Sequence, residues 1–503
     1  MIGFSRVVRS LAWSGTERLG SAVMLLLSAF AIARITGPVA FGIGALALTV
    51  TITFQIAAER FFHEAIVRQE NLTEAHVETA MIAAATVGLV LTGILFVLAS
   101  PVATMFGVPE LKLLIYIAAL GVLVAAPGGI VVALLHRDMA YRALASRSLI
   151  GSLCGACAGV AIALLGKGAI AIVIQSTVQV VVSVIAAAFA LGRIPKMRFS
   201  WKRLVDLGGF SVTILAETLI YTGAFRVFLM IFGLNAGMSA VGFVEFAHRL
   251  SSTLANFWMS AINPIALNIF AGAQRSRTAL AAAFMRASEI NLAVVVPLFI
   301  GLAFVTGDIL ALGVGPGWAM ATGPFCVFAI EGAIRLSRQF APQVFYAAGR
   351  PIFALYGAIV GFVVTNGMLL WLEPIDPTYI AVIWTARLAF TIPVSSLLLW
   401  HLTGLSPRAQ ASNMLPPACA ALIMTAVLWG AHRWFFADFG PALRLGCEII
   451  LGATVYVAAL FRIRPSFQAL LVEVGRELWR GSGEHGLQKK NASPGVGGHD
   501  PII

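Results

Sequence analysis

The sequence predicts an all-α polytopic membrane protein with about 14 transmembrane helices. We expect two six-helix lobes in parallel repeat and two extra C-terminal helices. Three observations lead to this prediction: the composition, the spacing of apolar stretches, and a match between positions 200 residues apart. Of 503 residues, 59% are apolar and 11% are charged, and the mean hydropathy is +0.92. Soluble domains hold about 25% charged residues. The composition therefore excludes an ordinary soluble enzyme, a secreted disulfide scaffold and a nucleic-acid-binding domain, because so few charges cannot cover a water-facing surface.

Long uncharged stretches mark the expected spans, because a helix of about 20 apolar residues crosses the hydrocarbon core. Five stretches have no ionisable residue and lie at 79–109, 113–135, 148–166, 168–192 and 409–431. Nine less pure stretches lie at 11–34, 41–62, 208–233, 241–265, 287–306, 321–345, 351–372, 379–400 and 441–461. Glycine and proline mark breaks at residues 37–38, 101, 107–109, 349–351 and 374–377.

The lysines and arginines are divided unequally between the two sides of the expected bundle. With fourteen spans both termini lie on one side, where 23 Lys and Arg residues lie, against five on the opposite side. Since positively charged loops stay in the cytoplasm, we expect both termini to be cytoplasmic. The net charge of +12 then reflects topology and attraction to anionic membrane lipids, so no nucleic acid is expected as a partner.

An internal repeat is indicated at an offset of 200 residues. Residues 37–42 and 237–242 both read G-x-x-A-x-G, and the same offset pairs Glu17 with Glu217. Both first spans start from the cytoplasm, so the halves would be related by an axis along the membrane normal, as in many transporters. After the second lobe we expect two added spans, then an amphipathic helix and a disordered tail. The predicted units are 1–195, 196–402, 403–464 and 465–503.

Ionisable side chains within the spans are the candidate site residues. A charge is costly in hydrocarbon, and it usually faces a bundle interior or a watery cavity. Guanidinium groups bind phosphate in bidentate geometry, so arginines at both depths suit an anionic cargo such as a diphosphate. The candidate substrate-binding residues are Arg18, Arg226, Arg249, Arg335 and Arg387, and the candidates for ion coupling or charge pairing are Glu17, Glu217, Glu245 and Glu331.

Internal pairing is the structural alternative for these charges. Glu245 with Arg249, and Glu331 with Arg335, are i,i+4 pairs on one helix face, and each pair can neutralise itself. For these four residues a structural and a functional role both stay open.

The remaining charges have no such neighbour. Glu217 and Arg226 are nine residues apart, or about 900° around a helix, so they point to opposite faces and each needs another partner. For Arg18 and Arg226 we favour a cavity-facing role. For Glu217, a cation or proton role and a structural role stay open.

Chemistry-bearing motifs are lacking in this sequence. We find no Walker loop, no G-x-S-x-G and no His-Glu-x-x-His. The five cysteines lie in apolar stretches, where cysteine behaves as a small hydrophobic residue. We therefore expect a protein that is not an enzyme, with no catalytic residues, no metal and no cofactor.

Short motifs at the turns between spans carry a family resemblance. Residues 33–42 (ARITGPVAFG) are similar to an A-R-x-L-x-P-x-x-F-G turn, and residues 241–250 (VGFVEFAHRL) to L-G-x-Y-x-x-A-x-R-L. Residues 134–142 (LLHRDMAYR) and 348–351 (AGRP) match two further turns. In combination these motifs resemble the Wzx-type polysaccharide transporters of the multidrug/oligosaccharidyl-lipid/polysaccharide superfamily. The resemblance covers about residues 8–400.

The resemblance implies a flippase for polyprenyl-diphosphate-linked oligosaccharide in a bacterial inner membrane, serving exopolysaccharide, capsule or lipopolysaccharide assembly. Its implied partners are this lipid-linked oligosaccharide, membrane lipids, and a polysaccharide polymerase or export machinery. One departure is that Ala224-Phe225-Arg226-Val227 stands where members often carry N-L-D, so an acidic residue is missing.

Two other functions remain open at this point. A multidrug/cation antiporter of the same superfamily should favour acidic cavities over arginine-rich ones. A membrane glycan polymerase or glycosyltransferase would need a large loop or domain for its catalytic site, whereas the loops expected here are short.

Overall fold

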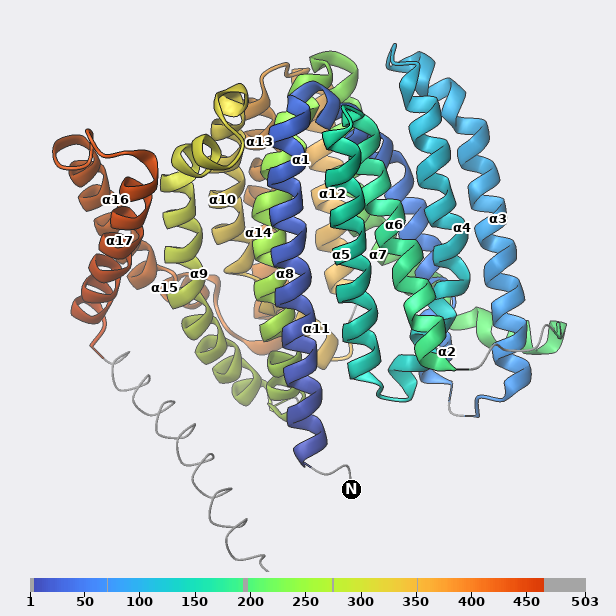
Figure 1. The fold of residues 1–503 in the computed structure, drawn as a ribbon. Helices are drawn as coiled ribbons and strands as arrows, with labels where there is room; N and C mark the ends of the chain where they lie inside the picture. The colour runs from blue at the N-terminus through green and yellow to red at the C-terminus, as the bar shows by residue number, and fades with distance from the viewer. Residues whose placement is uncertain (1–3, 70, 193–197, 274–275, 351, 466–503) are drawn as a thin grey trace, which may run out of the picture.

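The protein is a single bundle of helices that run roughly alongside one another (Figure 1). The computed structural model describes residues 4–69, 71–192, 198–273, 276–350 and 352–465, and every regular element within these ranges is helical. Eleven of the described helical segments are long and apolar enough to cross a membrane. Lipid offers the backbone no hydrogen-bond partner, so helices that satisfy their own backbone groups suit a membrane-spanning chain. The prediction of an all-α multi-pass membrane protein is confirmed. The predicted amphipathic helix and tail lie, from residue 466 on, outside the described residues.

The first half of the chain contributes six helices. These are α1 (Phe4–Arg60), α2 (His63–Arg68), α3 (Glu74–Met105), α4 (Glu110–Arg137), α5 (Tyr141–Leu164) and α6 (Gly168–Leu191). The expected break at Pro101 is wrong, because this residue lies inside α3. A proline removes one backbone hydrogen bond from a helix, and membrane helices tolerate that loss. The predicted break at residues 107–109 is confirmed, and Gly107 there has a φ of 65°, which favours glycine.

The second half begins with two helices of 36 residues, α7 (Trp201–Ala236) and α8 (Met238–Ala273). The side chains of Ser276, Asp376 and Ser406 cap the N-termini of later helices by accepting backbone hydrogen bonds. The remaining elements are α9 (Arg277–Gly313), η1 (Pro316–Ala321), α10 (Thr322–Leu336), α11 (Phe340–Ala347), α12 (Ile352–Leu372), α13 (Pro377–Ala386), α14 (Leu388–Thr403), α15 (Pro407–Ser412), α16 (Leu415–Trp434) and α17 (Pro441–Ile463).

The G-x-x-A-x-G turns have the same backbone in both copies and pack against each other. Gly37 has φ 72° and ψ 172°, and Gly237 has φ 81° and ψ 167°, a region that is essentially restricted to glycine. A Cβ on Gly42 would overlap the carbonyl oxygen of Met238, and a Cβ on Gly242 would overlap that of Pro38. The contact is therefore reciprocal, and it joins α1 to α8 at the end of the bundle away from the N-terminus (Figure 1).

An aromatic cluster surrounds this contact. Trp318 of η1 is 1% exposed, and its indole N–H donates to the carbonyl oxygen of Ala33 at 3.1 Å. Its ring lies 5.4 Å from that of Phe41 and 4.7 Å from that of Phe246, between ring centroids. The two halves of the chain are thus closed against each other at this end by buried aromatic surface.

Two ion pairs hold α17 along α9. Arg444 donates from Nε to Asp308 Oδ2 at 2.8 Å, and Arg464 Nε lies 3.0 Å from Glu289 Oε1. The two acidic residues lie about 28 Å apart along α9, at 1.5 Å per residue. The C-terminal helix pair is therefore fastened to α9 at two well-separated points.

Replacing Asp308 by Asn is expected to lower the free energy of unfolding by about 2 kcal/mol, the size of a lost charge-assisted hydrogen bond, because Asp308 is buried. The measurement is unfolding in mixed micelles with increasing SDS. Asp138→Asn is the matched control, because Asp138 is exposed, and it should change stability by less than about 0.5 kcal/mol. Equal stability of the two variants would show that the Asp308–Arg444 pair contributes nothing.

Candidate functional site

Arginines from several helices meet α8 along its length, beginning in its first half. Arg226 of α7 donates from Nη1 to Glu245 Oε1 at 3.0 Å. The other oxygen of Glu245 is buried and has no hydrogen-bond partner among the described residues. Arg249 lies one turn further along α8 and is half-buried. Two guanidinium groups therefore lie near one carboxylate.

Two more arginines reach the second half of α8. Arg335 of α10 lies with Nη1 at 3.6 Å from the sulfur of Met259, and Arg18 of α1 donates to the carbonyl oxygen of Ser260. From Glu245 to Ser260 the helix rises about 22 Å. We call the four arginines that follow α8 over this distance the α8 arginine row, namely Arg226, Arg249, Arg335 and Arg18.

One buried carboxylate joins the row to the junction of α13 and α14. Glu331 of α10 accepts from Nε of Arg335 at 3.1 Å and from Nη2 of Arg387 at 2.9 Å. The guanidinium of Arg387 also lies over the indole of Trp384, 3.8 Å from the ring centroid, in a cation–π contact. One negative charge is thus shared by two guanidinium groups.

Among the side chains that the structure describes, positive charge is in excess in this region. Four arginines of the second half, Arg226, Arg249, Arg335 and Arg387, face the two carboxylates Glu245 and Glu331. The side chains of Arg226, Arg335 and Arg387 keep 20%, 21% and 13% of their surface exposed, so they can still contact a ligand. An anion with two charges would balance the excess, and electrostatic attraction is strong where water is scarce.

The predicted pairings are partly correct. Glu331 and Arg335 form their i,i+4 pair, and Arg226 finds a partner elsewhere, as expected. The ion pair of Glu245, however, is to Arg226 of the neighbouring helix rather than to Arg249. Sequence spacing ranks only neighbours on the same helix, whereas the contact between α7 and α8 decided this pairing.

The neighbours Glu17 and Arg18 face different helices. Glu17 interacts with Arg147 and the hydroxyl of Ser148 on α5, whereas Arg18 reaches α8. Within the α8 arginine row, Glu17 is therefore near its sequence neighbour Arg18 alone, and its other partners are on α5. The side chain of Glu217 lies outside the described part of the chain, although its helix is described.

Sequence reasoning missed one residue of this region, His248. Its imidazole stacks on the ring of Phe225, with 3.5 Å between centroids. The sequence does show a histidine inside the predicted span 241–265. The candidate site residues, however, were chosen from the arginines and glutamates of the spans, so this histidine was not among them.

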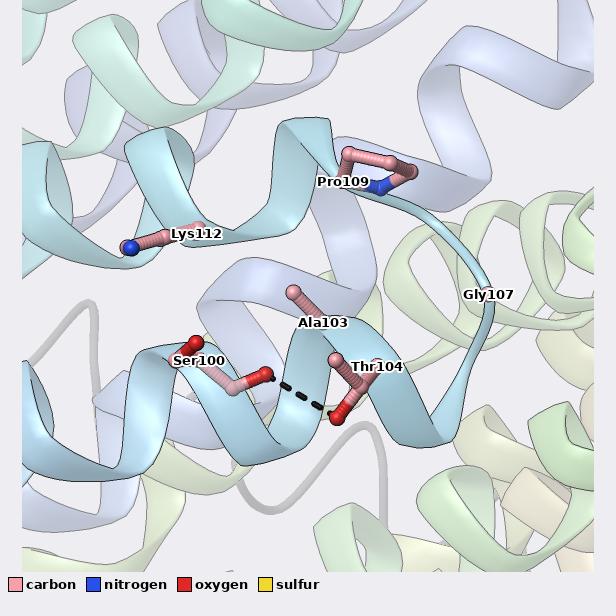
Figure 2. A pocket seen from close by; sticks show the side chains of 6 residues that line it. All are labelled: Ser100, Ala103, Thr104, Gly107, Pro109 and Lys112. Atoms are coloured by element: carbon pink, nitrogen blue, oxygen red, sulfur yellow. Dashed lines mark hydrogen bonds between the residues drawn. The ribbon is translucent and has the colours of Figure 1, made fainter.

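A small hollow lies at the turn between α3 and α4, away from these charges. Its volume is about 280 Å³ (Figure 2). The hydroxyl of Thr104 at its wall donates to the carbonyl oxygens of Ser100 and Pro101 at 3.2 and 2.8 Å, and Lys112 is its one charged lining residue. None of the predicted site residues lines this hollow.

A bundle with eleven apolar helical segments among its described residues defines a class of protein, the multi-pass membrane proteins. A family model described as "Polysaccharide biosynthesis protein" matches residues 31–322. The chain belongs to this family, and the match confirms the resemblance indicated by the motifs.

Two curated relatives cover almost the whole chain. The succinoglycan biosynthesis transport protein ExoT of Rhizobium meliloti (strain 1021) is 24% identical over 485 residues, covering 93% of this chain and 96% of that protein. The teichuronic acid biosynthesis protein TuaB of Bacillus subtilis (strain 168) is 21% identical over 432 residues, covering 85% and 89%.

Solved structures of transporters share the fold. The lipid II flippase MurJ in an inward closed conformation matches with a TM-score of 0.76 at 12% identity, covering 90% of this chain and 98% of that chain. An inward-facing multidrug resistance MATE family transporter matches with a TM-score of 0.52 at 14% identity, covering 78% and 96%. The fold is therefore that of a membrane transporter in both comparisons.

Proposed function

We propose that this protein is a flippase that moves polyprenyl-diphosphate-linked oligosaccharide repeat units across a bacterial inner membrane for polysaccharide biosynthesis. The α8 arginine row carries the proposal, because it lines about 22 Å of one helix with groups that bind phosphate oxygens in pairs. The family and the two curated relatives, which are named for succinoglycan transport and teichuronic acid biosynthesis, support the glycan cargo. The fold shared with a lipid II flippase supports the mode of transport.

The row explains how a diphosphate could cross without covalent chemistry. The arginines would hold the diphosphate in turn, from Arg18 near one end of the row to Arg226 near the other, while the polyprenyl chain stays in lipid. No bond is made or broken in this process, and no metal or cofactor takes part. Alternating access would require the Gly42–Gly242 contact to separate, since α1 and α8 are closed there.

We further propose 14 crossings in two lobes of six and a final pair. Eleven described segments are long and apolar enough to cross a membrane. The break at Gly37 divides the first of them into two crossings, and α7 and α8, which are not among the eleven, supply two more. The lobes would be 1–195 and 196–402, with the added pair in 403–464. The similar φ and ψ angles of Gly37 and Gly237 support the parallel repeat. The excess of Lys and Arg on the side of the bundle that holds both termini supports a cytoplasmic placement of the termini.

The antiporter alternative is not favoured by the charges. A cation carrier needs acidic groups where its cargo binds, but among the described side chains four arginines face two carboxylates here.

Deleting the gene is expected to stop surface polysaccharide while lipid-linked oligosaccharide accumulates on the cytoplasmic leaflet. Extraction and leaflet-selective labelling measure both quantities. Repeat units that reach the outer leaflet but stay unpolymerised would contradict the flippase and support a polymerase. Unchanged glycan with lower drug tolerance would support the antiporter.

Replacing Arg226 or Arg18 by Ala in the complemented strain is expected to cut export by about 10- to 100-fold, since each guanidinium offers hydrogen bonds worth roughly 1.5–3 kcal/mol to a charged ligand. Arg226→Lys keeps the charge next to Glu245 but loses the planar fork, so it should restore export only in part. Arg433→Ala is the control, because Arg433 is exposed and lies outside the row. Normal export from Arg18→Ala and Arg226→Ala at normal protein levels would refute the diphosphate assignment.

A further inference from the structure

The first turns of α7 cross the bundle at the end that carries the N-terminus, beside α2 (Figure 1). They are held to the first half of the chain at two points. The amide of Ser200 donates to the hydroxyl oxygen of Thr79 on α3 at 3.2 Å. Leu204 packs against a buried apolar cluster that includes Ile66 of α2 and Val77 of α3. The start of α7 is therefore fixed to α2 and α3, although the chain has already left the first six spans.

The hydrogen bond to Thr79 sets the depth of this segment in the membrane. Thr79 begins the uncharged stretch 79–109, which belongs to α3, one of the helices able to cross a membrane. A stretch of this length fills the hydrocarbon core of a bilayer, so its first residue lies near the edge of that core. Ser200 therefore lies close to the boundary between acyl chains and headgroups, where tryptophan and tyrosine are enriched in membrane proteins.

An apolar face of this segment is left uncovered by the described residues. The side chains of Trp201 and Val205 are 70% and 63% exposed, and their i,i+4 spacing places them on one face of the helix. The ring of Phe199, also exposed, lies 6.2 Å from that of Trp201 between centroids. Grouped apolar side chains of this kind mark contact with lipid or with another protein.

Basic side chains border this apolar face. Arg198 and Lys202 are both exposed, and at 100° per residue Lys202 lies next to Trp201 around the helix. Arg203 has an acidic neighbour, with 3.7 Å between its Nη1 and Asp206 Oδ2. The chain holds no acidic residue from 168 to 205. Aromatic and apolar side chains beside uncompensated cations match the chemistry of an anionic leaflet, whose acyl chains and phosphates lie next to each other.

We propose that residues 198–206 form an interfacial anchor that binds anionic phospholipids in the leaflet on the side of the N-terminus. The apolar face enters the boundary between headgroups and acyl chains, and Arg198 and Lys202 contact the phosphate groups. Because Ser200 and Leu204 fix the segment to α2 and α3, the lipid holds the start of the second half of the chain against the first half. No cargo is needed for this binding, so the inference stands apart from the proposed function.

The test is quenching of Trp201 emission by brominated lipids, with the full chain in phosphatidylcholine nanodiscs. The nanodiscs include the same fraction of either brominated phosphatidylglycerol, which is anionic, or brominated phosphatidylcholine, with bromine near the headgroup end of the acyl chains. Trp201 is one of ten tryptophans. Its emission is therefore measured as the difference between each protein and its Trp201→Phe counterpart.

We expect both lipids to quench Trp201, with a preference for phosphatidylglycerol of about fivefold or more, the effect of a single basic side chain at an anionic surface. Raising the salt from about 0.1 to about 1 M shortens the screening length from about 10 to about 3 Å, so it should remove most of this preference. In the double variant Arg198→Gln with Lys202→Gln the preference should fall below about twofold. The control is Arg277→Gln with Arg408→Gln, which removes the same charge from exposed positions on α9 and α15 and should keep the preference.

Each contrary result overturns a stated part of the proposal. Equal quenching by the two lipids in the unmodified protein overturns the recognition of anionic lipid. Quenching by aqueous acrylamide but by neither lipid shows that Trp201 faces water, which overturns the anchor and leaves its face to a protein partner. A preference that survives in the double variant overturns the assignment to Arg198 and Lys202. If that variant does not fold, the salt dependence of the unmodified protein still decides whether charge sets the preference.

Discussion

Polysaccharide export is expected to stop when Glu331 is replaced by Gln, and the protein should lose about 3–5 kcal/mol of stability, the usual cost of removing one partner from a buried ion pair. The Glu331 side chain is 5% exposed and is the carboxylate shared by Arg335 and Arg387. Without it two guanidinium groups would face each other at short range in a medium of low dielectric. Arg335 and Arg387 would move apart, and the part of the binding region that they form would be lost.

Two comparisons distinguish lost charge balance from lost binding. In the double variant Glu331→Gln with Arg387→Gln one of the repelling charges is gone, so stability should recover more fully than export. Glu110→Gln is the matched control, because Glu110 is exposed and its change should be nearly silent. Export assays in a deletion strain and SDS unfolding of the purified variants provide the two readouts. Wild-type export and stability in Glu331→Gln would show that this carboxylate does not organise the site.

Replacing Gly42 by Ala is expected to hold open the end of the bundle away from the N-terminus and to reduce export strongly. The new Cβ would overlap the carbonyl oxygen of Met238 and come 2.9 Å from the amide nitrogen of Gly242. Backbone atoms cannot rotate away as a side chain can, so α1 and α8 must separate. Overpacking of this kind costs about 1–3 kcal/mol, and here the cost falls on the closed state alone.

Labelling of a cysteine placed at Ala240 measures the separation directly. The labelling uses a variant in which the five native cysteines are replaced. Ala240 is buried at 6% exposure, so a cysteine there should react slowly with a maleimide when Gly42 is kept and rapidly when Gly42→Ala is added. Gly301→Ala is the control, because Gly301 lies inside α9 with open space around its Cβ position. Slow labelling together with normal export in Gly42→Ala would rule out this contact as the closing point.

The sequence predicted that the protein lies in a membrane and that its two halves form a repeat, because both features follow from local properties of the chain. A chain with 11% charged residues can only fold in lipid, and two matching G-x-x-A-x-G turns need the same glycine backbone wherever they lie. The pairing of Glu331 with Arg335 was also within reach, since helical periodicity places residues i and i+4 on one face. The failed break at Pro101 shows the limit of such local rules, because a long membrane helix absorbs one missing hydrogen bond.

The partners of the site residues were decided by tertiary structure alone. Arg387 reaches Glu331 across 56 residues of sequence, and Arg18 reaches Ser260 across 242. Periodicity shows which face of a helix is polar but not which neighbouring helix that face meets. The stack of His248 on Phe225 likewise arises only where α7 and α8 pack together. Composition and spacing thus determined that arginines enter the membrane. Helix packing decided which carboxylates, carbonyls and rings these arginines contact, because such contacts depend on the distances between helices, and sequence periodicity carries no information about those distances.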